Sequence, residues 1–182
     1  MEFIPTEIPE VVLIRPKVFG DQRGYFFESW EERKFAAGGL NVKFVQDNHS
    51  HSTRGVLRGL HYQIQQPQGK LVRVAAGRVF DVAVDIRRSS PTFGRWVGVE
   101  LSEQNHHMLW VPPGFAHGYL TLSDVADFLY RCTDFYAPSS ERAILWNDPD
   151  LKVVWPVFPG VEPVVSAKDA RARPFRDAEY FS

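Results

Sequence analysis

Short apolar runs with a period of two recur along the chain, and turn-forming residues separate them. The clearest run is "GRVFDVAVDIRR" at 77–88. One of its faces is apolar and carries Phe80, Val82, Val84 and Ile86. The opposite face carries Asp81, Ala83 and Asp85. Because successive side chains of a strand point to opposite faces of a sheet, this alternation predicts a half-buried β-strand.

Similar runs predict strands in most other parts of the chain. They are bounded by Gly, Pro, Ser, Asn or Asp and comprise "RGVLRGLHYQ" (54–63), "VVLIRP" (11–16), "VKFVQDN" (42–48), "LVRVAAG" (71–77), "RWVGVEL" (95–101), "HHMLWVPP" (106–113), "GYLTL" (118–122) and "VADFLYRCT" (125–133). About eight short strands of this kind are typical of a jelly roll, so the expected fold class is all-β, a jelly-roll barrel.

Two segments depart from the strand pattern. "ESWEERKFAAGG" at 28–39 has acidic residues in its first turn and ends on two glycines, which predicts a short peripheral helix. After "NDPDLKVVWP" the chain turns loop-like, with a last short helix expected near "SAKDARARPF" at 166–175. We expect one domain over 1–182, with N-terminal strands to about 50, a jelly-roll core over about 51–150 and a tail over 151–182.

Composition narrows the class of protein. The 44% hydrophobic content of the 182 residues is enough for a substantial core. The 21 basic residues nearly balance the 22 acidic ones, so no strong field favours nucleic acid or a membrane surface as partner. Cys132 is the only cysteine, which excludes an internal disulfide and fits a reducing compartment. Prolines and glutamates interrupt the N-terminal segment, and with no long apolar run elsewhere we expect a cytoplasmic protein.

Histidines are the first candidates for chemistry, and a barrel that carries six of them raises the question of a metal site. The "HSH" run at 49–51 has the spacing of a ligand pair but sits among polar residues in an expected loop. His61 is followed by Tyr62 and Gln63, so a second imidazole at ligand spacing is missing there. The ligand set is incomplete, and no metal is expected.

His61 has two interpretations, a hydrogen-bonded core histidine or a catalytic base. The period of two puts Gly59, His61 and Gln63 on one face, which is polar and resembles a pocket lining more than a packed wall. An imidazole titrates at an unperturbed pKa of about 6.5, which suits proton transfer at neutral pH.

Three other positions have equally open interpretations. Lys70 follows Gly69 at a strand mouth and is either a surface lysine or an inward-pointing cation. Tyr130 shares a face with Phe128 and Cys132 and is either a buried tyrosine or a proton donor. "FGDQRGYFFES" at 19–29 is either a structured hairpin or a clamp for a polar ligand.

Taken together, the motifs resemble the dTDP-4-dehydrorhamnose 3,5-epimerase family, a metal-free branch of the cupin-like jelly rolls. The resemblance runs nearly end to end, in the family's order and spacing. It rests on "FGDQRGYFFES", "QDNHS", "GVLRGLHYQ", "PQGKLVRV", "GRVFDVAVDIRRSSPTFGRW", "VPPGFAHGYL", "YRCTDFYAP" and "ERAILWNDP". It implies an isomerase without cofactor that inverts C3 and C5 of a thymidine diphosphate 4-keto sugar. The implied pathway is dTDP-rhamnose biosynthesis, which supplies rhamnose for polysaccharide or lipopolysaccharide. A ketone acidifies the hydrogens on both neighbouring carbons, so one base can serve both centres.

The resemblance also implies the site residues. His61 is expected to be the base, Tyr130 the acid, Lys70 the stabiliser of the enolate oxygen and Asp169, from the tail that closes the site, the carboxylate that orients the histidine. Tyr136 is expected to stack on thymine. The expected substrate-binding set is Arg23, Glu28, Gln46, Asp47, Asn48, Arg58, Lys70, His117, Tyr136, Glu141 and Lys168.

The expected partners are a small-molecule sugar nucleotide and a second copy of the chain, because the family forms homodimers by exchanging strands. The "VVLIRP" run would leave a sheet edge exposed if unpaired, which makes such exchange physically reasonable. Three alternatives stay open: an epimerase of a single centre, C3 or C5; a metal-dependent cupin enzyme; and a non-catalytic module that binds nucleotide sugars.

Overall fold

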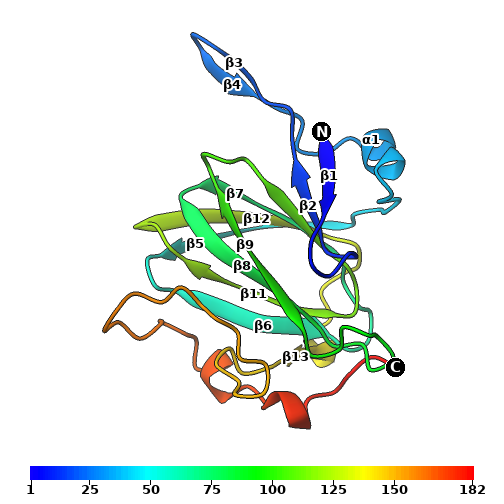
Figure 1. Cartoon of the computed structure of the whole chain (residues 1–182), viewed down its shortest axis with the longest axis vertical. Helices are drawn as coiled ribbons and strands as arrows, with labels where there is room; N and C mark the ends of the chain where they lie inside the picture. The colour runs from blue at the N-terminus through cyan, green and yellow to red at the C-terminus, as the bar shows by residue number, and fades with distance from the viewer.

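The computed structural model describes all 182 residues and is built around two antiparallel sheets that face each other. The first sheet has six strands in the order β1 (Glu2–Pro5), β2 (Val12–Arg15), β10 (Met108–Val111), β7 (Lys70–Ala76), β12 (Val125–Cys132) and β5 (Gln46–Thr53). The second has five strands in the order β13 (Glu141–Ala143), β6 (Leu57–Gln63), β11 (Phe115–Thr121), β8 (Arg78–Asp85) and β9 (Trp96–Ser102). Figure 1 shows the two sheets wrapped into a barrel, and the all-β expectation is confirmed.

Two segments outside the barrel pack on the outer faces of its two sheets. The N-terminal arm contains the hairpin β3 (Phe19–Asp21) and β4 (Gly24–Phe26), and the helix α1 (Glu32–Ala37). The C-terminal tail, orange to red in Figure 1, runs under β6 and β13 and contains 3₁₀ turns at Asp169–Arg171 and Phe175–Asp177. A further 3₁₀ turn spans Pro138–Ser140. The six-residue α1 is the longest helix, and no helix has the length and hydropathy that a bilayer crossing requires.

Apolar side chains fill three layers. The inner layer lies between the two sheets and includes Val72, Leu109 and Phe128. A second cluster joins the outer face of the five-stranded sheet to the tail, for example Val82 and Val84 with Trp155. The third joins the outer face of the six-stranded sheet to the arm around α1, where Phe35 is fully buried. Both outer faces are therefore covered, and burying them provides much of the driving force for docking the arm and the tail.

The expectation of a half-buried strand at β8 is wrong, because the outer face of the strand is covered as well. The strand is buried on both faces, because the tail packs on Val82 and Val84 while the polar face turns into the barrel. Asp81 and Asp85 are completely buried there. The sequence pattern was correct about the alternation, but the polar face is buried inside the barrel and is not a solvated surface.

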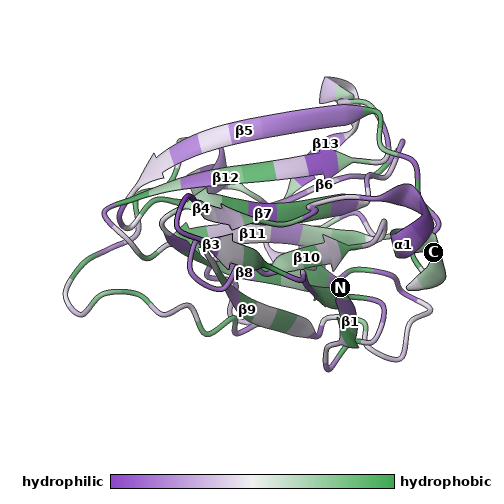
Figure 2. Ribbon diagram, turned by 90° about the horizontal axis from the view of Figure 1, so that it is seen from above, coloured by the Kyte–Doolittle hydropathy of each residue, from purple (hydrophilic) through white to green (hydrophobic).

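Other strand and helix boundaries also differ from expectation. β5 begins at Gln46 and continues through "HSH" to Thr53, so the expected loop at 49–51 is a strand and the expected strand at 42–45 is not. In Figure 2 this polar strand lies at the sheet edge. The helix expected from residue 28 begins at Glu32, where the Glu31 side chain accepts a hydrogen bond from the Lys34 N–H at 2.7 Å. The short helix expected near 166–175 is a pair of 3₁₀ turns.

The strand β2 is not an edge. It pairs with β1 on one side and with β10 on the other. The "VVLIRP" run is thus paired on both sides within one chain, and the condition for strand exchange at this run, an unpaired edge, is not met. The free edges of the six-stranded sheet are β1 and β5.

Candidate active site

A cavity of about 180 Å³ opens inside the barrel between the two sheets. Its lining is polar, and it adjoins a second hollow of about 90 Å³ toward the barrel mouth. Three residues line both hollows: His61, Lys70 and Tyr130. His61 comes from β6 in the five-stranded sheet, whereas Lys70 and Tyr130 come from β7 and β12 in the six-stranded sheet. The imidazole, the ammonium group and the phenol therefore lie on opposite walls of one space.

Two glycines bring β6 close to β11 beside the imidazole. A Cβ on Gly59 would lie 2.6 Å from the Gly118 Cα and 2.9 Å from the His117 carbonyl oxygen, and Gly59 has a φ of +132°. The strand register shifts between His117 and Tyr119. Residues with side chains at the two glycines would push the strands apart. The glycines thus allow His61 and His117 to sit opposite each other as register partners.

His61 is bound to a carboxylate from the tail. Its Nε2 lies 2.7 Å from Asp169 Oδ1, and the Gly59 N–H donates to Asp169 Oδ2 at 3.4 Å. Burial alone would raise the pKa of Asp169, but the hydrogen bond and charge of His61 hold that pKa below its usual value. An ionised carboxylate can only accept, so Nε2 carries the hydrogen and Nδ1 is left without a protein partner. The arrangement presents a free basic nitrogen to the cavity.

The opposite wall supplies a cation and a phenol. Burial lowers the pKa of Lys70, although the charges of Cys132, Asp81 and Glu141 work in the other direction. Burial is also the largest cause of the raised pKa of Tyr130. The Tyr130 phenol therefore stays protonated well above neutral pH and can donate a proton or a hydrogen bond to a molecule in the cavity.

A second imidazole–carboxylate pair completes the inner wall. His117 Nε2 lies 2.9 Å and 3.0 Å from the two carboxylate oxygens of Asp81, and both residues are buried. The sequence predicted His117 as a site residue but not Asp81. A signal was present, because Asp81 stands on the polar face of an otherwise apolar strand, but the pattern could not tell a solvated face from one that is buried inside the barrel.

The hollow at the barrel mouth contains five of the eleven residues expected to bind substrate, Lys70 among them. Gln46, Asn48, Tyr136 and Glu141 line it. Tyr136 donates from its hydroxyl to Glu141 Oε2 at 2.8 Å, and Lys168 forms an ion pair with the same carboxylate. Burial alone would raise the pKa of Glu141, but these two partners keep it low.

Arg58 borders the inner cavity from the edge of β6. Its guanidinium donates to Ser52 Oγ at 3.0 Å and to the His51 carbonyl oxygen at 3.2 Å. No carboxylate of the chain pairs with it. A guanidinium held by neutral acceptors keeps its charge available for an anion.

Five expected site residues line neither hollow; Lys168 and Asp169 are paired with the lining residues Glu141 and His61, whereas the other three make no such contact. Arg23 sits on the β3–β4 hairpin and pairs with Asp21, and its side chain is 90% exposed. Glu28 pairs with Lys34 in the arm. Asp47 points to the outer face of β5 and pairs with Arg131 at 3.4 Å. A single chain therefore does not bring these three residues to the cavity.

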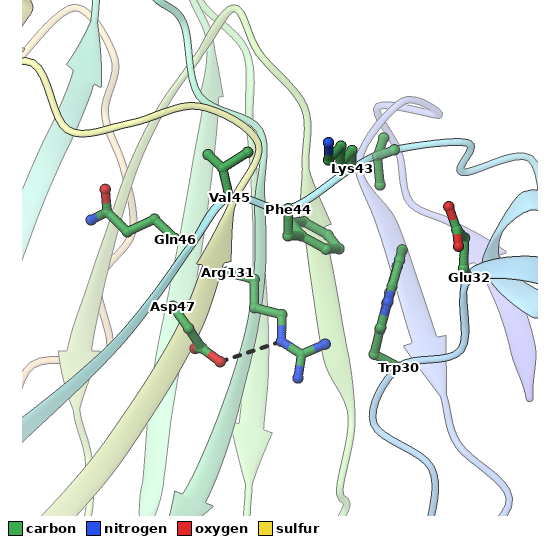
Figure 3. Close-up of a pocket in the computed structure, with 9 residues that line it drawn as sticks. Trp30, Glu32, Lys43, Phe44, Val45, Gln46, Asp47 and Arg131 are labelled. Carbon is green, nitrogen blue, oxygen red and sulfur yellow. Dashed lines mark ion pairs between the residues drawn. The ribbon is translucent and has the colours of Figure 1, made fainter.

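The largest hollow of the molecule is a separate groove of about 490 Å³ between the arm and the edge of the barrel. Figure 3 shows Trp30 on one side of this groove and Gln46, Asp47 and Arg131 on the other. It contains none of the three residues that line both inner hollows. Gln46 lines both this groove and the hollow at the barrel mouth, so the two spaces adjoin each other.

The histidines of "HSH" do not form a metal centre. His49 and His51 both bind Asp127 Oδ1 on the outer face of the sheet, at 3.1 Å and 2.8 Å. No group of three or more His, Cys, Asp or Glu side chains is arranged to hold a metal ion.

Comparisons with known proteins match nearly the whole chain. A family model described as dTDP-4-dehydrorhamnose 3,5-epimerase matches residues 5–177. The dTDP-4-dehydrorhamnose 3,5-epimerase of Pseudomonas aeruginosa is 59% identical over 175 residues, which cover 96% of each chain.

Solved structures match equally well. The 3,5-epimerase RmlC of Legionella pneumophila, in complex with dTDP-4-keto-L-rhamnose, superposes with a TM-score of 0.94 at 52% identity and covers 98% of this chain and 94% of its own. ChmJ of Streptomyces bikiniensis, a 3′-monoepimerase in complex with dTDP-quinovose, has a TM-score of 0.88 at 34% identity and covers 94% and 87%. The similarity is therefore greater to the double epimerases than to this single-centre enzyme.

Proposed function

The chain belongs to the dTDP-4-dehydrorhamnose 3,5-epimerase family, and we propose that it performs the family's two inversions with His61 as base and Tyr130 as acid. It is an enzyme of dTDP-L-rhamnose biosynthesis that converts dTDP-4-dehydro-6-deoxy-D-glucose to dTDP-4-dehydro-L-rhamnose. One observation carries the residue roles: an imidazole with a free nitrogen and a protonated phenol line one cavity from opposite sheets.

Proton removal is the role proposed for His61. The 4-keto group acidifies the hydrogens on C3 and C5, so Nδ1 can take each in turn while Asp169 stabilises the imidazolium that forms. The side chain of His61 is 31% exposed and that of Asp169 is 4% exposed. The base therefore faces the cavity, and its partner is shielded behind it. This shielding keeps the tautomer fixed during turnover.

Lys70 and Tyr130 complete the chemistry on the other wall. Removal of a proton leaves an enolate. Apart from the His61 imidazole, the Lys70 ammonium group is the only basic group that lines both hollows. It can stabilise the developing oxyanion in a partly desolvated site, where charge interactions are strong. Tyr130 then donates its hydroxyl proton to the face opposite His61, which inverts the centre. Solvent takes the proton from the imidazolium and gives one to the phenolate before the second inversion.

The nucleotide is proposed to extend from the inner cavity, where its diphosphate binds, to the mouth of the barrel, where its base binds. Arg58 and His117 border the inner cavity and suit the diphosphate. The flat Tyr136 ring suits the thymine base. The polar residues proposed to surround these groups are Gln46, Asn48, Glu141 and Lys168.

We further propose that the enzyme is a homodimer in which one chain completes the site of the other. The β3–β4 hairpin projects beyond the barrel in Figure 1 and exposes Phe19, Tyr25 and Phe26. A partner's hairpin would cover these side chains in the groove of Figure 3 and bring its Arg23 and Glu28 to the mouth beside Gln46. The groove carries charges of both signs, with Glu32 and Asp47 complementary to Arg23 and Lys43 and Arg131 complementary to Glu28.

Mixing two inactive variants tests the shared site. If Arg23 acts across the dimer, combining Arg23→Ala chains with His61→Asn chains restores activity, because the mixed dimer contains one intact site. If Arg23 acts within its own chain, mixing restores nothing. Sedimentation of the native enzyme gives the oligomeric state independently.

Deuterium incorporation tests the reaction itself. The enzyme is incubated with the 4-keto sugar nucleotide in deuterated water, and label is followed at C3 and C5. We expect label at both carbons. Label at one carbon would indicate a single-centre epimerase, and binding without label would indicate a non-catalytic module.

Two further proposals concern cofactor and location. We propose that turnover needs no metal, so activity is expected to survive dialysis against a chelator, and loss that added metal reverses would overturn this. We also propose a cytoplasmic location, which the single free and buried Cys132 supports.

A further inference from the structure

Glutamine side chains hold the segment that follows β12. This segment, 134–137, runs between the end of β12 at Cys132 and the 3₁₀ turn at Pro138 and has no strand partner. Four of its backbone groups are instead bonded by glutamine amides: the Asp134 carbonyl by Gln68 at 2.8 Å, the Phe135 carbonyl by Gln63 at 3.2 Å, the Tyr136 N–H by Gln46 at 2.9 Å and the Ala137 N–H by Gln63 at 2.8 Å. Side chains thus supply the backbone partners that a neighbouring strand would otherwise provide.

Gln63 is the centre of this arrangement. It is 4% exposed and lies on β6, two residues after His61. Its Nε2 donates to the Phe135 carbonyl and also to the Gln66 carbonyl at 2.8 Å, while its Oε1 accepts from the Ala137 N–H. An amide has two N–H donors, and both are used within the protein. Gln63 borders the mouth of the site but has no donor left for a ligand.

We propose that Gln63 is a positioning residue that sets the place of the Tyr136 ring and so the affinity for the nucleotide base. The proposal rests on the proposed function, in which Tyr136 stacks on thymine. Tyr136 is 53% exposed, so its ring packs against little of the protein, and its place is set by the backbone and by the hydroxyl bond to Glu141. Gln63 bonds the residues on both sides of Tyr136, so removing its amide loosens the backbone from which the ring projects toward the base.

Binding of dTDP to a Gln63→Met variant tests the role. Methionine keeps the length and volume of the side chain and removes both its donors and its acceptor. We expect the Kd for dTDP to rise about tenfold, because the less ordered ring must be fixed again when the base stacks on it. The KM of the sugar nucleotide should rise by the same factor while kcat stays within about twofold, because Gln63 does not touch the reacting carbons. Gln65→Met, an exposed neighbour without a side-chain hydrogen bond, is the matched control.

Two measurements separate positioning from general loosening of the fold. Pyrophosphate lacks the base, so its affinity should not change in Gln63→Met; an equal loss for pyrophosphate and dTDP would overturn the proposal. In a Tyr136→Ala background, Gln63→Met should cause no further loss of dTDP affinity, because the ring that it positions is gone. Additive losses would show that Gln63 acts by another route.

Other variants keep the test decisive if Gln63→Met folds poorly. Gln68→Met removes one bond to the same segment from a partly exposed position, and a smaller loss of dTDP affinity in the same direction is expected. Unchanged dTDP binding in both variants would overturn the proposal. If the native enzyme fails to bind dTDP, the proposed function fails; if it binds and the glutamine variants bind equally well, only this inference fails.

Discussion

Two imidazole–carboxylate pairs stand side by side on the five-stranded sheet, and they differ in access. His61 and His117 are register partners on β6 and β11, and each binds one aspartate through Nε2. The His61 side chain is 31% exposed, whereas that of His117 is 7% exposed. Asp169 reaches His61 from the distant tail, while Asp81 reaches His117 from the neighbouring strand β8.

The difference indicates two uses of the same chemistry. An imidazole that faces the cavity, with its partner behind it, can accept and release protons. An imidazole enclosed together with its carboxylate is better suited to hold a fixed hydrogen-bonding direction toward a bound group. Substitutions in the two pairs should therefore affect turnover and binding differently.

The largest effect is expected for His61→Asn. Asparagine can still donate a hydrogen bond to Asp169 but cannot take a proton from carbon. We expect kcat to fall by about 10⁴-fold, with no deuterium at C3 or C5. His49→Asn, on the outer face of the sheet, is the control and should retain native turnover. Normal deuterium exchange at C3 and C5 in His61→Asn would contradict the assignment of His61 as the base.

Tyr130→Phe should come next. Removing the hydroxyl leaves His61 able to remove protons but leaves no donor on the opposite face. We expect inverted product to form about 10²- to 10³-fold more slowly while label exchange persists. Tyr119→Phe offers a comparison, because the Tyr119 hydroxyl bonds Ser50 at 2.9 Å in the same cavity. Equal effects of the two variants would contradict a specific role for Tyr130.

Asp169→Asn should reduce kcat by roughly 10- to 100-fold with little change in KM. The amide keeps the volume of the carboxylate but loses the charge that stabilises the imidazolium. Steady-state kinetics at neutral pH measure this effect. A change confined to KM would indicate that the His61–Asp169 pair contributes to substrate binding and not to proton transfer.

Asp81→Asn should show the opposite pattern, with KM raised about tenfold and kcat changed by less than about threefold. The buried pair holds His117 toward the bound substrate and is not proposed to exchange protons with it. Thermal unfolding of the variant, measured alongside, reports whether the buried site has folded. A fall in kcat equal to that of Asp169→Asn would remove the distinction between the two pairs.

The smallest effect concerns pH. Burial lowers the pKa of Lys70, so its charge is lost as pH rises through a value below the usual lysine pKa of about 10.4. Because the pKa of Tyr130 is raised, the tyrosine does not account for this loss. We expect kcat/KM to decline on the alkaline side in the native enzyme, and Lys70→Arg to move that decline to higher pH. An unchanged profile in Lys70→Arg would assign the decline to another group.

Prediction from the sequence succeeded where the information is local. The alternation in β8 and the glycine stop after α1 depend on neighbouring residues, and both are present. It failed at "HSH", where polar composition indicated a loop, because pairing of β5 with β12 overrides local preference. It also failed for Asp81, because burial of a polar face depends on the opposite sheet.

The sequence by itself determined the all-β class and the family, because periodicity and motif spacing are written in the order of residues, and the family resemblance predicted His61, Lys70, Tyr130 and Asp169 as site residues. Only the tertiary structure decided that Asp81 supports His117 and that glutamines hold the Tyr136 segment. These contacts join positions far apart in the chain. Their distances follow from how two sheets close around a cavity, and no local pattern of residues encodes that closure.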